Sequence, residues 1–213
     1  MRFSFSMTIL VFACTAPTVL AQRWEVGVAG GGSFYTSETV KNPIGNATAG
    51  ISPGFTVSGW LANNNNNVLG GELRYDYEHS GLKLSSNGTN VNFGAQTNAI
   101  HYDFLLHFAP SEAHMRPFIA GGAGVKVYSG TGKEETFQPL SNIALLTRTS
   151  QFQPLVSVGG GVKYTLTPGT LLRLEAHDYL TPFPKNVIAP AEGSKVGGWL
   201  SDFVLEAGLS FAF

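Results

Sequence analysis

The residues best suited to acid–base or nucleophilic chemistry are the histidines, with the serines and aspartates near them in the sequence. The five histidines are His79, His101, His107, His114 and His177. A nucleophile and its base must lie within hydrogen-bond reach, about 2.6–3.2 Å. His79 is followed by Ser80, but neighbouring residues of a strand point to opposite faces, and the same holds for His177 and Asp178. His101 and Asp103 share a face, and alternation places no serine beside them. The sequence therefore predicts no catalytic residues and no enzyme.

Metal and cofactor binding have no better support. His101, Asp103 and His107 would lie on one strand, where three such groups spread over about 20 Å. The only cysteine, Cys14, excludes a zinc site built on several thiolates and a disulfide scaffold. Gly132-Lys133 is followed by Glu134 rather than Ser or Thr, and it lacks the preceding glycine of a phosphate loop. We expect no metal and no cofactor.

The other residues that could do chemistry are charged side chains at alternate positions of predicted strands. Six of them make up the predicted interior charge network: Glu72, Arg74, Asp76, Arg173, Glu175 and Glu206. Lys126 and Lys163 are expected beside them. Charges enclosed in a narrow lumen must be paired, because leaving one uncompensated costs about 3–5 kcal/mol. The sequence favours salt bridges that fill the interior, and a regulated pore built from the same network is the alternative.

These charges belong to segments in which apolar and polar residues alternate with a period of two, as in strands with two different faces. In the segment 69–78, Leu73, Tyr75 and Tyr77 share one face and the charged residues share the other. Eight such segments are expected near residues 23–35, 50–61, 68–79, 97–108, 116–128, 151–166, 171–181 and 198–213. Each has about ten residues, near the 9–11 that a tilted strand needs to cross a bilayer. An even number of strands lets an antiparallel sheet close with both chain ends on one side.

The connections between these segments alternate in length. The short ones are 63–67, 109–114 and 167–170, and the long ones are 36–49, 80–96, 129–150 and 182–197. The long connections have roughly 14–22 residues, where the median in compact domains is about 4–6. A membrane barrel with short turns on one side and long loops on the other has this pattern. We expect one domain without an internal linker.

Composition agrees with a chain that hides much of its surface from water. Only 13% of the 213 residues are charged, against roughly 25% in soluble domains, and 43% are hydrophobic. The formal net charge of −1 excludes a disordered chain, and it leaves no basic excess for a nucleic-acid partner. Glycine is abundant, with 26 residues, and clusters at 30–32, 121–124 and 159–161 inside predicted strands. Such clusters indicate tight curvature or close side-chain approach, as a small barrel requires.

The first 21 residues have the features of a secretory signal peptide. Met1 and Arg2 form a positive start, 3–13 is apolar, and Val19-Leu20-Ala21 resembles a cleavage site. The apolar run is too short for a transmembrane helix. A lipoprotein acylation site at Cys14 is the alternative, which the bulky Phe12 disfavours. We therefore expect a signal peptide over 1–21 and a barrel domain over 22–213.

Alternation alone does not separate a membrane barrel from a soluble lipocalin-like carrier of small ligands. In the soluble case the charged face meets water, whereas in the membrane case the apolar face meets lipid and the charges lie inside. The signal peptide favours the membrane. So do aromatic residues near strand ends, at Tyr75, Tyr77 and Trp199, because an interfacial girdle requires that placement.

Two segments resemble a known family. The sequence FVLEAGLSFAF at 203–213 resembles the closing strand of bacterial outer-membrane barrels, and RPFIAGGAGV at 116–125 is similar to the arginine-proline-aromatic, glycine-rich strand of small OmpA-type barrels. The resemblance implies that the outer-membrane assembly machinery reads a signal at Leu209, Phe211 and Phe213. No periplasmic domain follows in the printed chain, so anchoring to peptidoglycan by such a domain is not expected. Some small barrels act on lipids with a serine and a histidine, which leaves a lipid-modifying enzyme as an alternative.

The sequence thus predicts an all-β fold, an eight-stranded antiparallel up-and-down transmembrane β-barrel in the bacterial outer membrane. We expect a non-enzymatic protein with four surface loops, no open pore, and a structural or adhesion and interaction role. The expected partners are outer-membrane lipids and lipopolysaccharide and the outer-membrane assembly machinery. We expect a monomer.

Overall fold

The structure, a computed structural model, describes residues 24–64, 66–134 and 137–213. The predicted signal peptide and Cys14 lie outside these residues. Every regular element of the described chain is a β-strand. The described residues contain no helix long and apolar enough to span a membrane.

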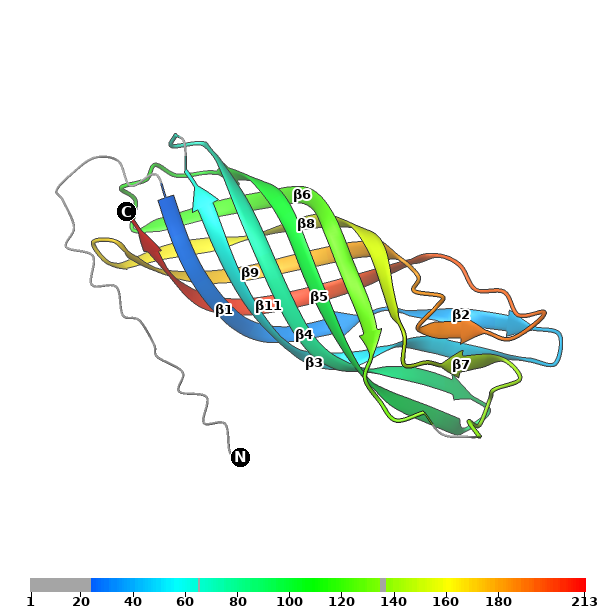
Figure 1. The fold of residues 1–213 in the computed structure, drawn as a ribbon. Helices are drawn as coiled ribbons and strands as arrows, with labels where there is room; N and C mark the ends of the chain where they lie inside the picture. Colours follow the sequence, from blue (N-terminus) through cyan, green and yellow to red (C-terminus); the bar gives the residue numbers. More distant parts are fainter. Residues whose placement is uncertain (1–23, 65, 135–136) are drawn as a thin grey trace, which may run out of the picture.

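Eight long strands form a closed antiparallel barrel (Figure 1). They are β1 (Trp24–Tyr35), β3 (Gly45–Asn63), β4 (Leu69–Ser86), β5 (Thr89–His107), β6 (Met115–Gly130), β8 (Ser150–Thr167), β9 (Thr170–Pro182) and β11 (Trp199–Ala212). Each strand pairs with the next one along the chain, and β1 closes the ring because it pairs with both β3 and β11. The predicted fold class is confirmed.

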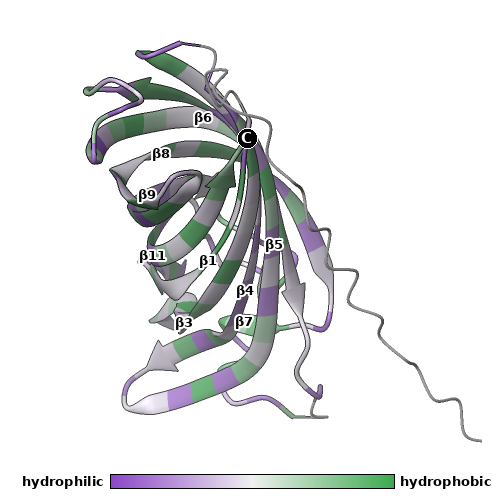
Figure 2. Ribbon diagram, turned by 90° about the vertical axis from the view of Figure 1, so that its left-hand side faces the viewer, coloured by the Kyte–Doolittle hydropathy of each residue, from purple (hydrophilic) through white to green (hydrophobic). Residues whose placement is uncertain are grey.

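The two faces of the barrel wall differ in polarity, as the alternation predicts, and Figure 2 shows the bands of opposite hydropathy along the strands. Large apolar side chains point outward and are exposed, including Val28 at 64% and Phe104 at 71%. The inward positions of β4 and β9 carry charged side chains, and Arg74 and Arg173 are fully buried. A lipocalin-like protein would have the opposite arrangement. The lipocalin-like alternative is therefore wrong.

The two ends of the barrel are unlike. At the end that holds Trp24 and Phe213, the connections between strands are short: from Asn63 to Leu69, from His107 to Met115 and from Thr167 to Thr170, close to the predicted positions. We call this the short-turn end. At the opposite end, the long-loop end, three further strands occur: β2 (Ser37–Asn42), β7 (Ala144–Leu146) and β10 (Ile188–Pro190). β2 pairs with β3, and β7 pairs with β10 (Figure 1).

The prediction of long loops at 36–49 and 80–96 is wrong in its detail. β4 and β5 continue far beyond the predicted strand ends and meet in a turn at Asn87 and Gly88, whose φ angles are 47° and 82°. Two central residues with positive φ are the requirement of a type I′ hairpin turn, for which Asn-Gly is the preferred sequence. The segment 36–49 likewise forms the β2–β3 hairpin. Because these segments are polar in composition, their alternation was not recognised in the sequence and they were predicted as loops.

A hydrophobic cluster explains why these hairpins are ordered. At the long-loop end the inward positions change from charged to apolar, and they pack against the segments around β7 and β10. We call this cluster the apolar cap: Val40, Ala47, Ala49, Ile51, Leu82, Leu84, Phe93, Ala95, Tyr128, Ile143, Ala144, Leu146, Phe183, Val187, Ile188 and Leu200. The barrel interior is therefore closed at this end by packed apolar side chains.

Inward glycines let the strands and interior side chains approach closely. A Cβ atom on Gly31 would overlap the carbonyl oxygen of Leu205 on the neighbouring strand β11. On Gly122 it would overlap the carbonyl oxygen of Tyr102 and a carboxylate oxygen of Asp103. The prediction that the glycine clusters serve close approach is confirmed at these positions.

Substituting Gly31 should separate this effect from strand propensity. We expect Gly31→Ala to lower the free energy of unfolding by about 1–3 kcal/mol, because the methyl group overlaps backbone that cannot move without breaking the β1–β11 ladder. The matched control is Gly30→Ala, where the nearest atom would lie 3.8 Å away. Urea unfolding in micelles measures both. Equal losses for the two variants would contradict the packing explanation.

Candidate functional site

The six residues of the predicted interior charge network come together in the barrel. Arg74 on β4 lies at the centre: its Nε is 2.9 Å from Glu72 Oε1, and its Nη1 is 2.7 Å from Glu206 Oε2. Arg74 also forms an ion pair with Glu175. Asp76 is more distant, with 3.9 Å between its Oδ1 and Arg74 Nη1. All of these side chains are buried, so strands β4, β9 and β11 are joined through the interior.

The network extends toward the short-turn end through Arg173 and Glu25, a residue outside the predicted network. Arg173 Nη1 lies 2.7 Å from Glu72 Oε2 and 3.0 Å from Glu25 Oε1, and Arg173 also pairs with Glu175. Glu25 on β1 accepts a further hydrogen bond of 2.6 Å from Lys163 Nζ. The guanidinium of Arg173 stacks on Trp60, 4.3 Å from the ring centroid. Glu25 lies within the predicted strand 23–35, and its position between the outward Trp24 and Val26 was the signal that could have placed it inside.

Toward the long-loop end a second cluster surrounds Lys126. Its Nζ lies 2.8 Å from Glu78 Oε1 and 2.5 Å from Asp202 Oδ2. Tyr35 donates its hydroxyl to the other oxygen of Glu78. Glu78 has the same strand parity as Glu72, Arg74 and Asp76, and Asp202 has the same parity as Glu206. The alternation in the sequence could therefore have predicted both as members of the interior network. The Lys126 cluster lies directly below the apolar cap, which contains Tyr128.

One serine does lie beside the pair of His101 and Asp103, so the expectation that no serine accompanies them is wrong. Ser157 Oγ donates to Asp103 Oδ2 at 3.1 Å, and His101 Nδ1 lies 3.1 Å from Asp103 Oδ1. Ser157 is on β8, and Gly122 on the intervening strand β6 leaves room for the contact. Alternation within one strand could not reveal a neighbour two strands away.

The order of these groups does not suit nucleophilic catalysis. Ser157 bonds to the carboxylate of Asp103 and not to the imidazole of His101, whose Nε2 instead lies 3.0 Å from Asp76 Oδ2. Both ring nitrogens of His101 therefore face carboxylate oxygens. Each of these two contacts needs a proton, carried either by the ring nitrogen or by the carboxyl group. No ring nitrogen remains to accept a proton from the serine, as a base must. The cluster acts as a structural hydrogen-bond network.

The interior holds more acidic than basic side chains. The buried carboxyl groups of the described chain belong to Glu25, Glu72, Asp76, Glu78, Asp103, Glu175, Asp202 and Glu206. The buried Lys and Arg residues are Arg74, Arg116, Lys126, Lys163 and Arg173. His177 adds a contact of 3.1 Å from its Nε2 to Glu175 Oε2. Among the described residues no three His, Cys, Asp or Glu side chains are placed to hold a metal ion. The interior therefore combines ion pairs with hydrogen bonds and offers no metal centre of that kind.

Of the residues predicted to carry the assembly signal, Leu209 and Phe211 lie on the outer face of β11, and Phe213 directly follows the strand. Leu209, Phe211 and Phe213 are exposed by 44%, 57% and 67%. They do not contact the interior charge network. Their role in assembly stays a prediction.

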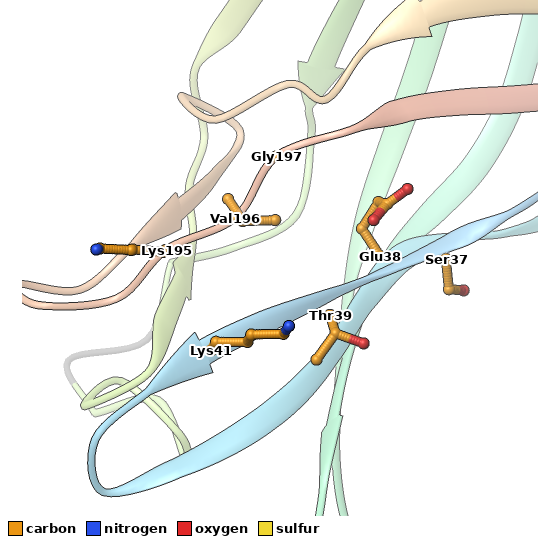
Figure 3. A pocket seen from close by; sticks show the side chains of 7 residues that line it. All are labelled: Ser37, Glu38, Thr39, Lys41, Lys195, Val196 and Gly197. Carbon is orange, nitrogen blue, oxygen red and sulfur yellow. The ribbon is translucent and has the colours of Figure 1, made fainter.

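A polar groove of about 540 Å³ lies at the long-loop end, beside the outer edge of β2 (Figure 3). Backbone hydrogen bonds of 2.9 and 2.8 Å join Lys41 to Lys195. The Glu38 carboxylate lies next to Gly198, where a Cβ atom would be 2.7 Å from Glu38 Oε1. Figure 3 shows that the side chains of Lys41 and Lys195 point apart. Because the two ammonium groups do not converge, this groove has no prepared anion site.

Comparison with known proteins agrees with this architecture. A search of curated proteins found no match. Among solved structures, the outer membrane protein OprG from Pseudomonas aeruginosa is similar, with a TM-score of 0.57 and 11% identity over 90% of this chain and 97% of OprG. Neisserial surface protein A matches with a TM-score of 0.55 and 13% identity over 89% of this chain and 97% of that protein. A major outer membrane protein from Thermus thermophilus matches with a TM-score of 0.50 and 14% identity, over 89% and 99% of the two chains.

At these identities the structural matches support the fold alone. The family comparison is more specific, because the model described as "Outer membrane protein beta-barrel domain" matches residues 6–211. That range includes all eight barrel strands almost to the end of β11. The chain is a small outer-membrane β-barrel protein and belongs to the outer membrane protein beta-barrel domain family.

Proposed function

We propose that this protein is a sealed, non-enzymatic scaffold that displays a rigid β-structure on the cell surface, with a structural or interaction role. The observation that carries the proposal is the filled interior. Ion-paired side chains occupy the barrel along β4, β9 and β11, and the apolar cap covers them at the long-loop end. In such barrels the long connections are extracellular and the short turns periplasmic. The cap and its hairpins therefore face the outside of the cell.

An eight-stranded barrel has an interior just wide enough to be filled by side chains, whereas 16-stranded porins leave an aqueous channel. Arg74, Arg173 and Lys126 are fully buried and hold carboxylates from several strands. Opening a path for ions would require breaking these pairs and displacing the cap. This favours a closed barrel over the regulated pore.

The same interior disfavours the lipid-modifying enzyme. A catalytic serine and histidine acting on lipid need access to the bilayer surface, whereas Ser157 and His101 are buried in the barrel. Their hydrogen bonds to Asp103 and Asp76 leave no base for the serine. We extend the proposal to a monomer that the outer-membrane assembly machinery inserts through Leu209, Phe211 and Phe213, and the outward exposure of these residues supports this.

A conductance measurement tests the sealed barrel. We expect the refolded protein, verified by heat-modifiable migration on gels, to produce no ohmic steps in planar bilayers. The reason is that the paired charges and the apolar cap leave no continuous aqueous path. A 16-stranded porin reconstituted in parallel verifies that the assay detects channels. Reproducible current steps from the folded protein would show that the barrel conducts and is not sealed.

A further inference from the structure

We propose that an outward polar face of the extracellular sheet binds the saccharide chains of glycolipids in the same membrane leaflet. We call it the polar sheet face, and it consists of Thr39, Thr48, Ser85, Asn90, Lys83 and Asn92. This inference rests on the proposed scaffold role, since it requires the hairpins to lie outside the cell. It specifies which part of the expected lipopolysaccharide partner is bound and where on the molecule it binds.

The register brings these six side chains together. Thr39 pairs with Thr48, and Thr48 pairs with Ser85, so three strands contribute neighbouring hydroxyl groups in one row. Ser85 pairs with Asn90, which extends the row to β5, and the Ser85 hydroxyl lies 2.6 Å from Asn90 Oδ1.

The adjacent row contains Lys83 opposite Asn92. Residues at alternate positions of these strands point inward into the apolar cap, for example Leu84 and Phe93. The polar sheet face is therefore the outer side of the wall that covers the cap.

The chemistry of the polar sheet face suits a ligand rich in hydroxyl groups. Its hydroxyl and amide side chains both donate and accept hydrogen bonds, and none of its residues is acidic or apolar. A protein interface would require aromatic or other large apolar anchors at its centre, which this face lacks. A nucleic acid would require several cations, and Lys83 is the only Lys or Arg among the six residues of this face. Saccharide hydroxyl groups match the donors and acceptors that are present.

A groove beside the face has the same chemistry. It has a volume of about 320 Å³ and lies between the tips of the β2–β3 and β4–β5 hairpins. Thr39, Thr48 and Ser85 line it together with Asn46 and Asn87, and no charged residue is among its described lining residues. Sugar rings on the polar sheet face could continue into this groove without meeting a carboxylate.

The direction in which the face points identifies the source of the saccharide. The same strands carry the outward aromatic residues Phe55 and Tyr77, whose ring centroids are 6.5 Å apart. Such residues mark the membrane interface in β-barrels. The Tyr77 hydroxyl donates to Gln96 at 3.4 Å, so the polar surface begins directly at this boundary.

Lys83 follows six residues after Tyr77 on β4, about 20 Å further along the strand. The polar sheet face points sideways from the barrel wall, at the height of saccharide chains that extend outward from the headgroups of neighbouring lipids. A saccharide in the medium would first meet the hairpin tips.

Three vesicle compositions test the proposal with the full refolded chain. They contain lipopolysaccharide with core sugars, lipid A without core sugars, or phospholipid alone. A ligand that binds the folded state raises the unfolding temperature. We expect the midpoint to be roughly 2–4 °C higher with core-sugar lipopolysaccharide than with lipid A. The triple variant Thr48→Ala/Asn90→Ala/Asn92→Ala should lose this difference. The control variant Asn142→Ala/Asn186→Ala removes two exposed amides from other extracellular segments and should keep it.

Equal midpoints with lipopolysaccharide and lipid A would overturn the proposal, because the core sugars would then contribute nothing. A triple variant that folds and keeps the full difference would overturn it as well. If free core oligosaccharide in detergent produces the same rise, the source is not membrane glycolipid, and the proposal is wrong in that respect. The conductance measurement is independent of these outcomes, so failure here is distinguishable from failure of the sealed scaffold.

Discussion

Replacing Arg74 with alanine should lower the free energy of unfolding by about 3–5 kcal/mol. Arg74 bonds to Glu72, Glu175 and Glu206. Removing its guanidinium leaves Glu206 without its ion-pair partner. Glu72 and Glu175 then keep one arginine, Arg173. Breaking one side of a buried ion pair is costly because the remaining charge stays desolvated. Urea unfolding of the refolded protein in micelles, followed by tryptophan fluorescence, measures the loss.

Two further variants make the Arg74 experiment specific. Arg148→Ala removes an exposed arginine near β7 and should change the free energy of unfolding by no more than about 0.5 kcal/mol. Adding Glu206→Gln to Arg74→Ala removes one of the uncompensated charges and should restore part of the loss. If Arg74→Ala is as stable as Arg148→Ala, the interior network does not stabilise the barrel.

Truncating Leu146 should destabilise the apolar cap. Leu146 on β7 is fully buried in the cap, and Leu146→Ala should cost about 2–5 kcal/mol through lost burial and the remaining cavity. The barrel below is held by its own ladders and ion pairs, so the effect should concentrate on the β7–β10 pair. We expect faster proteolytic cleavage within 144–146 and 183–190, measured under native conditions by mass spectrometry.

The adjacent residue provides the matched control. Leu145 points the opposite way and is 39% exposed, so Leu145→Ala should leave the cleavage rate near that of the unchanged protein. Equal cleavage in both variants would mean that β7 is not held by packing in the cap. Faster cleavage at the short turns would mean that the cap and the barrel unfold as one unit.

The barrel strands and the interior charges could be predicted because both depend on the period-two alternation. In the segments around Arg74, Arg173 and Glu206 the charges of the network lie on one face of the strand, at alternate positions, and a closed sheet has only one interior for them. The outward exposure of Phe104 and Phe211 follows from the same parity. For these residues, local pattern and global fold agree.

The alternation within one strand does not predict contacts between side chains of different strands. Ser157 meets Asp103 only because β8 lies two strands from β5 and Gly122 leaves space between them. The extracellular hairpins were missed for another reason, since their outer face is as polar as a loop. The Asn87-Gly88 pair was the available signal, because it is the preferred sequence of a two-residue hairpin turn. Small inward residues such as Ala47 and Ala49 formed an apolar pattern too weak to predict a strand there.

The measurement that tests the orientation of the two faces most directly is quenching of a fluorescent label in bilayers. Single cysteines at Leu205→Cys, Leu209→Cys and Asn90→Cys, in a Cys14→Ser background, place the label on the outer face of β11 or on the polar sheet face. We predict that lipid-borne quenchers reach the labels at 205 and 209, and that an aqueous quencher reaches only the label at 90. Aqueous quenching at 205 and 209 as strong as at 90 would contradict a lipid-facing apolar band and an enclosed charged interior.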